Sequence, residues 1–475
     1  MSKRPLLLAC LLCLSAFAAD WAQFRGPNGS GVAEEQGLPI RFGPDQNVIW
    51  KTPLPPGFSS PVLSAGQIFL TGAEGDKLFT LCLDRATGKI LWRREAPRSR
   101  VQELHKANHP ASPSPVTDGR NVFVFFTDFG LISYGPDGQE RWRLPLGPFN
   151  NPFGMGASPV LAGDKLLMIC DQESGSFFVA VGKDDGKIRW RKERPDVTRG
   201  FSTPVLYRPS TGPLQVLVSG AYRLAAYSVD TGEEVWWVRG LTWQLKSTPV
   251  LGPDTIYVHG WAGSADDGQQ EDVGPFEDVL QRMDADKDGK LSRNEVVDPR
   301  ITKEWRAADL DDTGYLEERD WRFYRSRRSA HNGVTAFRLG GRGDMTEASF
   351  RWRYAKSLPN VPSPLLYKDV LYLVKEGGIL TALDPGAGNV LKQGRLEGAL
   401  GQYFASPVAS DNKLYTVSQE GKATVLKAGR DWEILAVNDL NEECHATPAI
   451  AGGRIYIRTR STLYCFGQPR DATAN

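Results

Sequence analysis

A repeating unit of forty to fifty residues constrains the fold of this 475-residue chain more than any other feature. One half of the unit is a serine or threonine followed by proline, at the start of a hydrophobic run. Most spacings between these prolines lie in the forties, but Pro249 and Pro364 are separated by one ordinary unit and roughly seventy extra residues. The eight prolines are Pro61, Pro115, Pro159, Pro204, Pro249, Pro364, Pro407 and Pro448.

The other half of the unit is a glycine followed four residues later by tryptophan, as in Gly88 and Trp92. Short alternating apolar runs lie between the halves, so each unit predicts four antiparallel strands. Glycine suits the turn before the last strand because that turn needs a positive φ. A four-stranded sheet cannot cover both of its faces alone, and eight units therefore predict an all-β, eight-bladed β-propeller. The pair recurs at Gly138 and Trp142, Gly186 and Trp190, and Gly232 and Trp236.

The two ends of the chain are expected to complete one shared blade. Residues 47–50 have the pattern of an outer strand with no blade before it, and residues 445–466 supply three strands with no tryptophan strand after them. Joining them closes the ring and removes exposed sheet edges. We predict that Trp50 packs as Trp92 does. Lys392 stands at the tryptophan position of the sixth unit, and the seventh unit has no matching tryptophan, so we expect less regular packing there.

The extra residues, 262–331, are acidic and have a helical pattern. Within them, residues 284–295 read DADKDGKLSRNE, with carboxylates at loop positions one, three, five and twelve and glycine at six. This is the pattern of an EF-hand, which wraps hard oxygen ligands around one calcium ion. The predicted ligands are Asp284, Asp286, Asp288, the carbonyl of Lys290, and Glu295.

A second acidic loop follows at residues 309–320, DLDDTGYLEERD. Its neutral fifth position and its shorter aspartate at position twelve predict weaker calcium binding. The insertion lies between the second and third strands of blade five, on the same face as the connections between blades. We expect it to overhang that face, which we predict binds a protein partner or a small ligand. The second set of predicted ligands is Asp309, Asp311, Thr313, the carbonyl of Tyr315, and Asp320.

The beginning of the chain predicts export from the cytoplasm. Two basic residues, a short apolar run and an A-x-A site at residues 16–18 indicate a signal peptide at 1–18, with a lipid anchor at Cys10 as the alternative. No later run is long enough to span a membrane. We therefore expect a periplasmic or extracellular protein. The propeller is assigned to residues 19–261 and 332–475, and four cysteines remain, of which Cys444 and Cys465 are either paired or buried thiols.

Charge and motifs exclude several functions. Lysine and arginine total 57 against 56 aspartate and glutamate, so there is no basic surface for nucleic acid. Neither a G-x-S-x-G elbow nor an H-E-x-x-H helix is present, and we predict no catalytic residue. His105 and His109 precede prolines and are expected in turns.

The run LDRATGKILW at residues 83–92 resembles the pyrroloquinoline-quinone-like propeller repeat. That family includes quinone-dependent alcohol dehydrogenases, in which quinone and calcium lie on the propeller axis. The chain also resembles the periplasmic propeller subunit of the machinery that inserts outer-membrane β-barrels, a non-catalytic scaffold. Because the recognisable calcium loops lie in the insertion, we predict a monomeric calcium-binding scaffold. A quinone-dependent alcohol or sugar dehydrogenase is the alternative, and the quinone is not expected.

Overall fold

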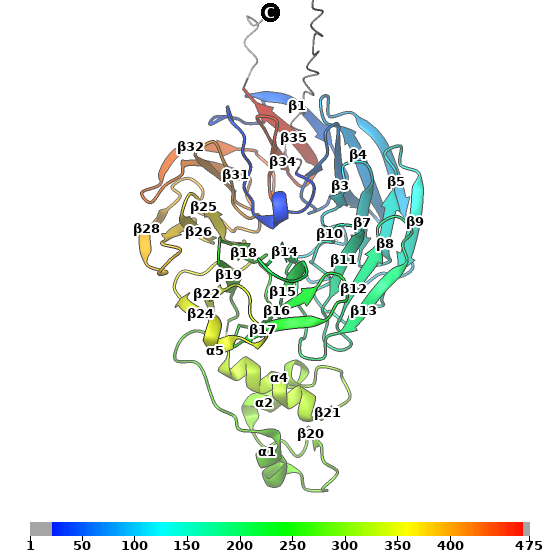
Figure 1. Ribbon diagram of the computed structural model, residues 1–475, viewed down its shortest axis with the longest axis vertical. Helices are drawn as coiled ribbons and strands as arrows, with labels where there is room; N and C mark the ends of the chain where they lie inside the picture. Colours follow the sequence, from blue (N-terminus) through cyan, green and yellow to red (C-terminus); the bar gives the residue numbers. More distant parts are fainter. Residues whose placement is uncertain (1–20, 264, 469–475) are drawn as a thin grey trace, which may run out of the picture.

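The computed structural model describes residues 21–263 and 265–468, which form eight four-stranded antiparallel sheets around a common axis (Figure 1). The predicted eight-bladed propeller is therefore confirmed. The predicted signal peptide at 1–18 and the alternative anchor at Cys10 lie outside the described residues. None of the helices in the described ranges is long and apolar enough to cross a membrane.

The first four blades follow one another along the chain, each with its innermost strand first. Their strands are β2 (Val62–Leu63), β3 (Gln67–Glu74), β4 (Lys77–Asp84), β5 (Ile90–Ala96); β6 (Val116–Thr117), β7 (Val122–Phe126), β8 (Gly130–Tyr134), β9 (Glu140–Pro145); β10 (Val160–Ala162), β11 (Lys165–Cys170), β12 (Phe177–Gly182), β13 (Ile188–Glu193); β14 (Val205–Tyr207), β15 (Gln215–Gly220), β16 (Arg223–Ser228) and β17 (Glu234–Arg239).

The last four blades have the same order, and the eighth takes its outer strand from the beginning of the chain. Their strands are β18 (Val250–Leu251), β19 (Thr255–Gly260), β22 (Gly333–Arg338), β24 (Phe350–Tyr354); β25 (Leu365–Tyr367), β26 (Val370–Lys375), β27 (Ile379–Leu383), β28 (Val390–Arg395); β29 (Val408–Ser410), β30 (Lys413–Val417), β31 (Lys422–Lys427), β32 (Glu433–Asp439); β33 (Ala449–Ala451), β34 (Arg454–Arg458), β35 (Thr462–Gly467) and β1 (Val48–Pro53).

The outer-strand tryptophans join each blade to the next. The Trp92 ring packs against Gly138, whose φ is 78° and where an added Cβ would lie 2.7 Å from the ring. Its Nε1 donates a hydrogen bond to the Pro136 carbonyl at 2.9 Å. Glycine is therefore required both for the positive φ and for the close approach.

Trp50 makes the same contacts across the closure of the ring. It pairs with Cys465 in β35, its ring packs on Gly88, and its Nε1 donates to the Arg85 carbonyl at 3.2 Å. The predicted equivalence of Trp50 and Trp92 is confirmed. Blade eight is thus built from both ends of the chain, and β1 pairs with the edge of β35 that would otherwise be exposed.

In blade six, a lysine stands at the tryptophan position, and the aromatic ring of the contact is supplied by the next blade. Lys392 Nζ lies 4.8 Å from the ring centroid of Trp432 in blade seven and donates to its carbonyl at 2.8 Å. Trp432 is buried. The aromatic ring thus comes from the following blade, and this replaces the missing tryptophan of β28.

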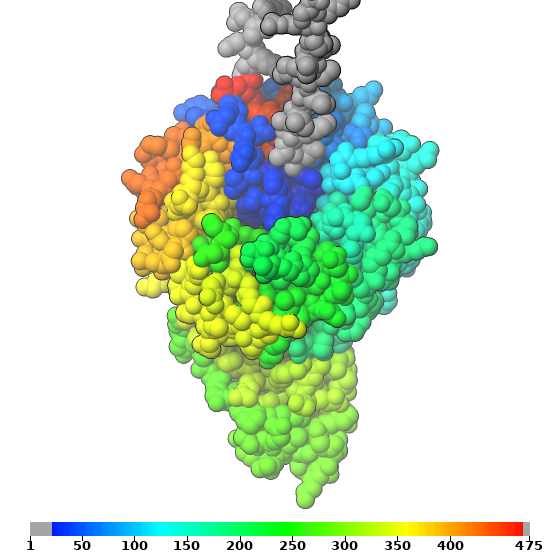
Figure 2. Space-filling model, viewed as in Figure 1, coloured from blue at the N-terminus to red at the C-terminus, as the bar shows by residue number. Residues whose placement is uncertain are grey.

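The segment before β1 closes one end of the axis. Its 3-10 helix η1 (Pro27–Gly29) lies at the centre of the ring in Figure 1, and Figure 2 shows these residues at the middle of that face. The segment is tied to inner strands of several blades. The contacts are Leu63 N to Trp21 O, Thr117 N to Ala22 O, Asn28 with both backbone groups of Leu206, Arg25 Nη2 to Pro364 O, and Ala409 N to Gly31 O.

The inserted segment between β19 and β22 carries most of the helices. Most of it extends outward beyond the rim in Figure 1, but residues between Arg306 and Asp312 line a cavity together with connections between the blades, so the insertion overhangs the face only at its edge. After β22, the short strand β23 (Gly343–Asp344) adds parallel to β17 of blade four. The insertion comprises α1 (Phe276–Met283), β20 (Leu291–Ser292), α2 (Pro299–Lys303), α3 (Trp305–Ala308), β21 (Tyr315–Leu316) and α4 (Glu318–Ser329), and α5 (Thr346–Ser349) follows β23.

Candidate functional site

The serine or threonine of each repeat belongs to a ring of hydrogen bonds around the axis. The Ser60 backbone N–H donates to Ser114 Oγ at 2.9 Å, so each hydroxyl accepts from the preceding blade. The link from Thr203 to Thr248 is not formed, and Thr248 Oγ1 has no partner among the described residues. The other links join Ser114 N to Ser158 Oγ, Ser158 N to Thr203 Oγ1, Thr248 N to Ser363 Oγ, Ser363 N to Ser406 Oγ, Ser406 N to Thr447 Oγ1 and Thr447 N to Ser60 Oγ.

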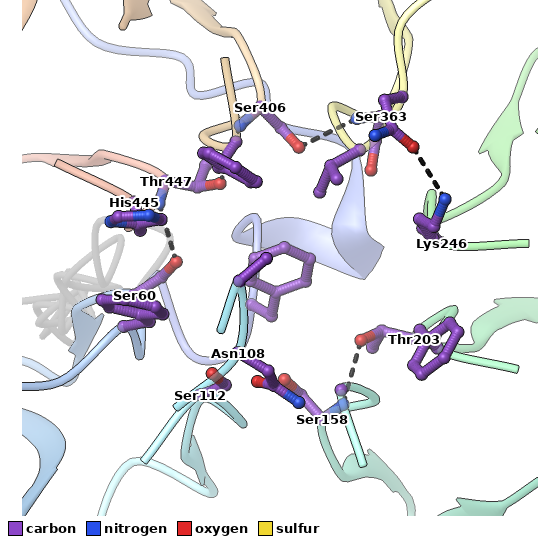
Figure 3. A pocket seen from close by; sticks show the side chains of 18 of the residues that line it. Ser60, Asn108, Ser112, Ser158, Thr203, Lys246, Ser363, Ser406, His445 and Thr447 are labelled. Atoms are coloured by element: carbon purple, nitrogen blue, oxygen red, sulfur yellow. Dashed lines mark hydrogen bonds between the residues drawn. The ribbon is translucent and has the colours of Figure 1, made fainter. Parts of the chain in front are cut away.

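A second set of side chains lies two residues before each member of this ring. Together with seven members of the ring, all except Thr248, and with Phe24 of the N-terminal segment, these residues line a cavity of about 450 Å³, which we call the funnel (Figure 3). Ser112 and Gly156 are small, and His105, Asn108 and Phe153 also line that part of the cavity. The set consists of Phe58, Ser112, Gly156, Phe201, Lys246, Val361, Phe404 and His445.

The histidines of the funnel are held by aromatic and backbone contacts. His445 stacks on Phe58 with centroids 3.9 Å apart, and burial lowers its pKa against the opposing charge of Glu443. His105 and His109 lie in turns, as predicted, and each accepts at Nδ1 the N–H of the residue two positions ahead. Burial, with nearby arginines, lowers the pKa of His109 to about 4. His109 and His445 are therefore neutral at neutral pH, and His445 forms an aromatic part of the funnel wall.

Lys246 is the only lysine or arginine that lines the funnel in the described chain. Its Nζ donates to Asn360 Oδ1 at 2.7 Å and lies 6.0 Å from the Trp261 ring centroid. Burial lowers its pKa to about 8. Figure 3 places Lys246 across the cavity from His445 and Ser60. No aspartate or glutamate of the described chain lines the funnel, so this ammonium has no carboxylate partner there.

The insertion is anchored to the rim through α4. Arg319 Nη2 donates to the Glu173 carbonyl at 2.6 Å, and the Phe323 ring stacks on Tyr222 with centroids 6.1 Å apart. Beneath these contacts, the buried Glu173 carboxylate pairs with Arg199 at 2.5 Å. Aromatic and ionic contacts thus fix one side of the insertion to blades three and four.

The first acidic loop gathers three predicted ligands. One ligand oxygen each from Asp284, Asp286 and Glu295 lies within 4.8 Å of the others, and Asp284 Oδ1 is buried without a hydrogen-bond partner among the described residues. A backbone hydrogen bond from Asp288 lowers the pKa of Asp286, but desolvation and the three neighbouring carboxylates outweigh it and raise that pKa. Asp288 lies outside the compact group, and its Oδ1 accepts Lys290 N at 2.9 Å.

The second acidic loop is joined to the first by a short β-bridge in which Leu291 pairs with Leu316. Asp309 Oδ2 accepts Gly314 N at 2.9 Å, and Asp320 accepts Leu310 N and Glu317 N. Burial raises the pKa of Asp320 to about 6. Among the described residues, no three side chains of this loop meet as closely as those of the first loop, and the carbonyl of Tyr315 is taken by Thr313 Oγ1 at 3.3 Å.

A second cavity lies between this loop and the funnel. It has a volume of about 670 Å³ and is lined by residues of the insertion, including Asp309 and Asp312, and by the rim residues Glu173 and Arg199. His105 and Phe153 line both cavities. The second loop is therefore adjacent to the mouth of the funnel, although the insertion as a whole extends away from it.

Sequence reasoning missed the inner lining of the funnel. The signal was present, since every such residue stands three positions before a repeat proline. This position has no common chemistry, because phenylalanine, serine, glycine, lysine, valine and histidine all occur at it in different repeats. The open question of the cysteines is answered by the structure: Cys82, Cys170, Cys444 and Cys465 are all buried free thiols.

Comparison with known proteins places the chain among propellers of one family. A family model described as outer membrane protein assembly factor BamB matches residues 40–191 and 175–469. No curated protein is similar enough in sequence to match.

Three solved structures show the shared fold. BamB from Moraxella catarrhalis is 12% identical, with a TM-score of 0.55 over 90% of this chain and 100% of that chain. Quinohemoprotein alcohol dehydrogenase from Comamonas testosteroni is 12% identical, with a TM-score of 0.58 over 97% of this chain and 82% of that chain. The computationally designed Ika8 protein is 10% identical, with a TM-score of 0.52 over 91% and 100%. These identities show the fold alone, whereas the family model spans most of the sequence, and the chain belongs to the family described as outer membrane protein assembly factor BamB.

Proposed function

We propose that this protein is an exported, non-catalytic binding module that holds calcium in its inserted acidic loops. In this proposal, the face that carries the funnel mouth and the connections between blades binds a protein partner. The description of the matching family supports a partner involved in outer-membrane protein assembly.

The observation that carries the proposal is the separation of carboxylates from the axis. Among the described residues, the three-carboxylate group able to hold a metal ion is Asp284, Asp286 and Glu295, in the insertion. The funnel is lined by hydroxyl, aromatic, amide and histidine side chains with a single lysine. Calcium takes six to eight hard oxygens, and its affinity for a protein site depends on how many charged carboxylate ligands the site supplies. The donor set therefore favours calcium in the insertion.

Each ligand has a defined task in this proposal. Asp284 and Asp286 open the first loop, and Glu295 closes it with both oxygens. In the structure, Glu295 accepts hydrogen bonds from Ser292 N at 2.8 Å and from Ala285 N at 3.0 Å, which hold it over the loop. Calcium binding relieves the repulsion that raises the pKa of Asp286.

Calcium in the insertion would also order part of the binding face. The second loop lines the cavity beside the funnel mouth, and α4 is anchored on the rim through Arg319 and Phe323. We infer that calcium stabilises this side of the face and leaves the propeller itself unchanged, because the ring closes through contacts that do not involve the insertion.

The quinone-dependent dehydrogenase is the alternative, and the funnel residues fit it poorly. The volume of about 450 Å³ accommodates a flat tricyclic ligand. However, the described residues of the funnel offer neither a carboxylate base nor an acidic ligand for an axial calcium ion.

Calorimetric titration of the metal-stripped protein tests the proposal. We expect calcium to bind, and Glu295→Gln to weaken the tightest site, whereas the matched variant Glu277→Gln on α1 leaves it unchanged. Pyrroloquinoline quinone, added in the presence of calcium, should support no calcium-dependent dye reduction. Quinone binding with calcium-dependent dye reduction would establish the dehydrogenase instead, and the absence of calcium binding would refute the assignment of the acidic loops.

A further inference from the structure

The ring of hydroxyl groups presents unused donors to the funnel. Within residues 21–263 and 265–468, seven of these oxygens accept a backbone N–H, and none of the eight hydroxyls donates a hydrogen bond to a protein acceptor. Each hydroxyl carries one donor hydrogen besides its acceptor lone pairs. The inner end of the cavity therefore offers several hydroxyl donors that no protein acceptor uses, beside hydroxyl lone pairs that can still accept.

Lys246 adds a positive charge to the same cavity. An ammonium group has three donors, and in the described chain Lys246 Nζ uses one of them on Asn360 Oδ1. Lys246 interacts electrostatically with His259, which is buried and whose pKa lies at about 4. The other titratable side chains lining the funnel are His105 and His445, and no carboxylate of the described residues faces Lys246. A partly buried cation without a counter-ion favours an anionic ligand.

The remaining walls are apolar and aromatic. Phe24, Phe58, Phe153, Phe201, Trp261 and Phe404 line the funnel. A cavity of about 450 Å³ with aromatic walls and a few convergent polar groups is typical of a site for one small molecule.

We propose that the funnel binds a small ligand that joins a planar apolar body to a single oxyanion group. Lys246 pairs with the oxyanion, the Ser/Thr ring donates hydrogen bonds to it, and the phenylalanine and tryptophan side chains cover the apolar body. The site goes beyond the proposed protein-binding role and involves no residue of the calcium loops, so it stands or fails separately from that role.

Two fluorescent probes of nearly the same shape test this site. Anilinonaphthalene sulfonate carries one oxyanion, and phenylnaphthylamine is its neutral analogue. We expect the wild-type protein to bind one sulfonate probe per chain, at least about tenfold more tightly than the neutral probe, because a charge-assisted hydrogen bond is worth more than a neutral one. Equal affinities for the two probes in the wild-type protein would overturn the proposal without recourse to any variant.

Variants then locate the site. Lys246→Met should weaken sulfonate binding by about tenfold or more and leave neutral-probe binding nearly unchanged, whereas Lys246→Arg should retain most of the affinity. Lys89→Met, on an exposed turn of blade one, is the matched control and should bind as wild type does. Val361→Trp fills the funnel and should abolish binding of both probes. Undiminished sulfonate binding in Lys246→Met or in Val361→Trp would place the probe elsewhere and refute the site.

Discussion

Replacement of Gly88 by alanine tests how the two ends of the chain close the propeller. Gly88 has a φ of 74°, and an added Cβ would penetrate the Trp50 ring. Gly75, in the turn between β3 and β4, also has a positive φ, 57°, but nothing lies within 4 Å of its added Cβ. Comparing the two alanine variants therefore separates the cost of backbone strain from the cost of the clash with Trp50.

The expected losses of unfolding free energy follow from the backbone strain and from the clash with the Trp50 ring. Left-handed backbone costs an alanine about 1–2 kcal/mol, so Gly75→Ala should lower the free energy of unfolding by that amount. Displacement of a packed ring adds about 1–3 kcal/mol, so Gly88→Ala should cost about 2–5 kcal/mol. Trp50→Ala removes a side chain that is 8% exposed and should cost about 3–5 kcal/mol.

A double-mutant cycle isolates the contact. In a Trp50→Ala background, Gly88→Ala keeps the strain of about 1–2 kcal/mol and the close contact of the added Cβ with Thr52 Oγ1 at 2.7 Å, but it loses the clash with the ring, a coupling of about 1–3 kcal/mol. Urea unfolding followed by circular dichroism, with the denaturation midpoint and slope compared across variants, measures these differences. Equal losses for Gly75→Ala and Gly88→Ala, or additive losses in the double variant, would refute the latch contact.

Three further predictions concern the insertion, the core and the funnel. Glu295→Gln should weaken the tightest calcium site on the order of tenfold or more, because ligand charge sets calcium affinity, and isothermal calorimetry against Glu277→Gln measures this. In the wild-type protein, the buried Asp171 carboxylate lies 2.8 Å from Arg194 Nε. Arg194→Met leaves this carboxylate without its partner and should lower the free energy of unfolding by about 3–5 kcal/mol. Adding Asp171→Asn should restore part of that loss in the same urea assay, and an unchanged loss would contradict the pairing. Since burial lowers the pKa of Lys246 to about 8, the lysine loses its charge as pH rises through that value, and the affinity for the sulfonate probe should fall by up to about tenfold per pH unit above it. His259 and His445 titrate below this pH range, because burial lowers their pKa values. An affinity that stays constant from pH 7 to 10 would contradict the role of Lys246.

The sequence predicted the architecture because its repeat encodes local backbone geometry. Proline begins each innermost strand, where its missing N–H costs no ladder bond. The glycine and tryptophan of each unit specify one turn and one contact with the next blade, and Trp50 with Gly88 follows the same rule at the closure. Blade six could not be predicted from its own residues, since the ring that faces Lys392 is Trp432 of the following blade.

The candidate sites were predictable to different degrees. The acidic loops are contiguous in sequence, so spacing alone brought Asp284, Asp286 and Glu295 together, and the structure places them within 4.8 Å. The funnel is assembled from eight connections far apart in the chain, and its chemistry depends on which side chain of each connection faces the axis. The direction of the insertion depended on the anchoring of α4 to Glu173 and Tyr222, contacts that no local pattern contains.

An anomalous-difference map from crystals grown with calcium tests whether calcium is held by the insertion and not on the axis. We expect a peak between Asp284, Asp286 and Glu295, and no peak inside the funnel beside the Ser/Thr ring. A calcium peak in the funnel, or an acidic loop left empty at saturating calcium, would contradict it.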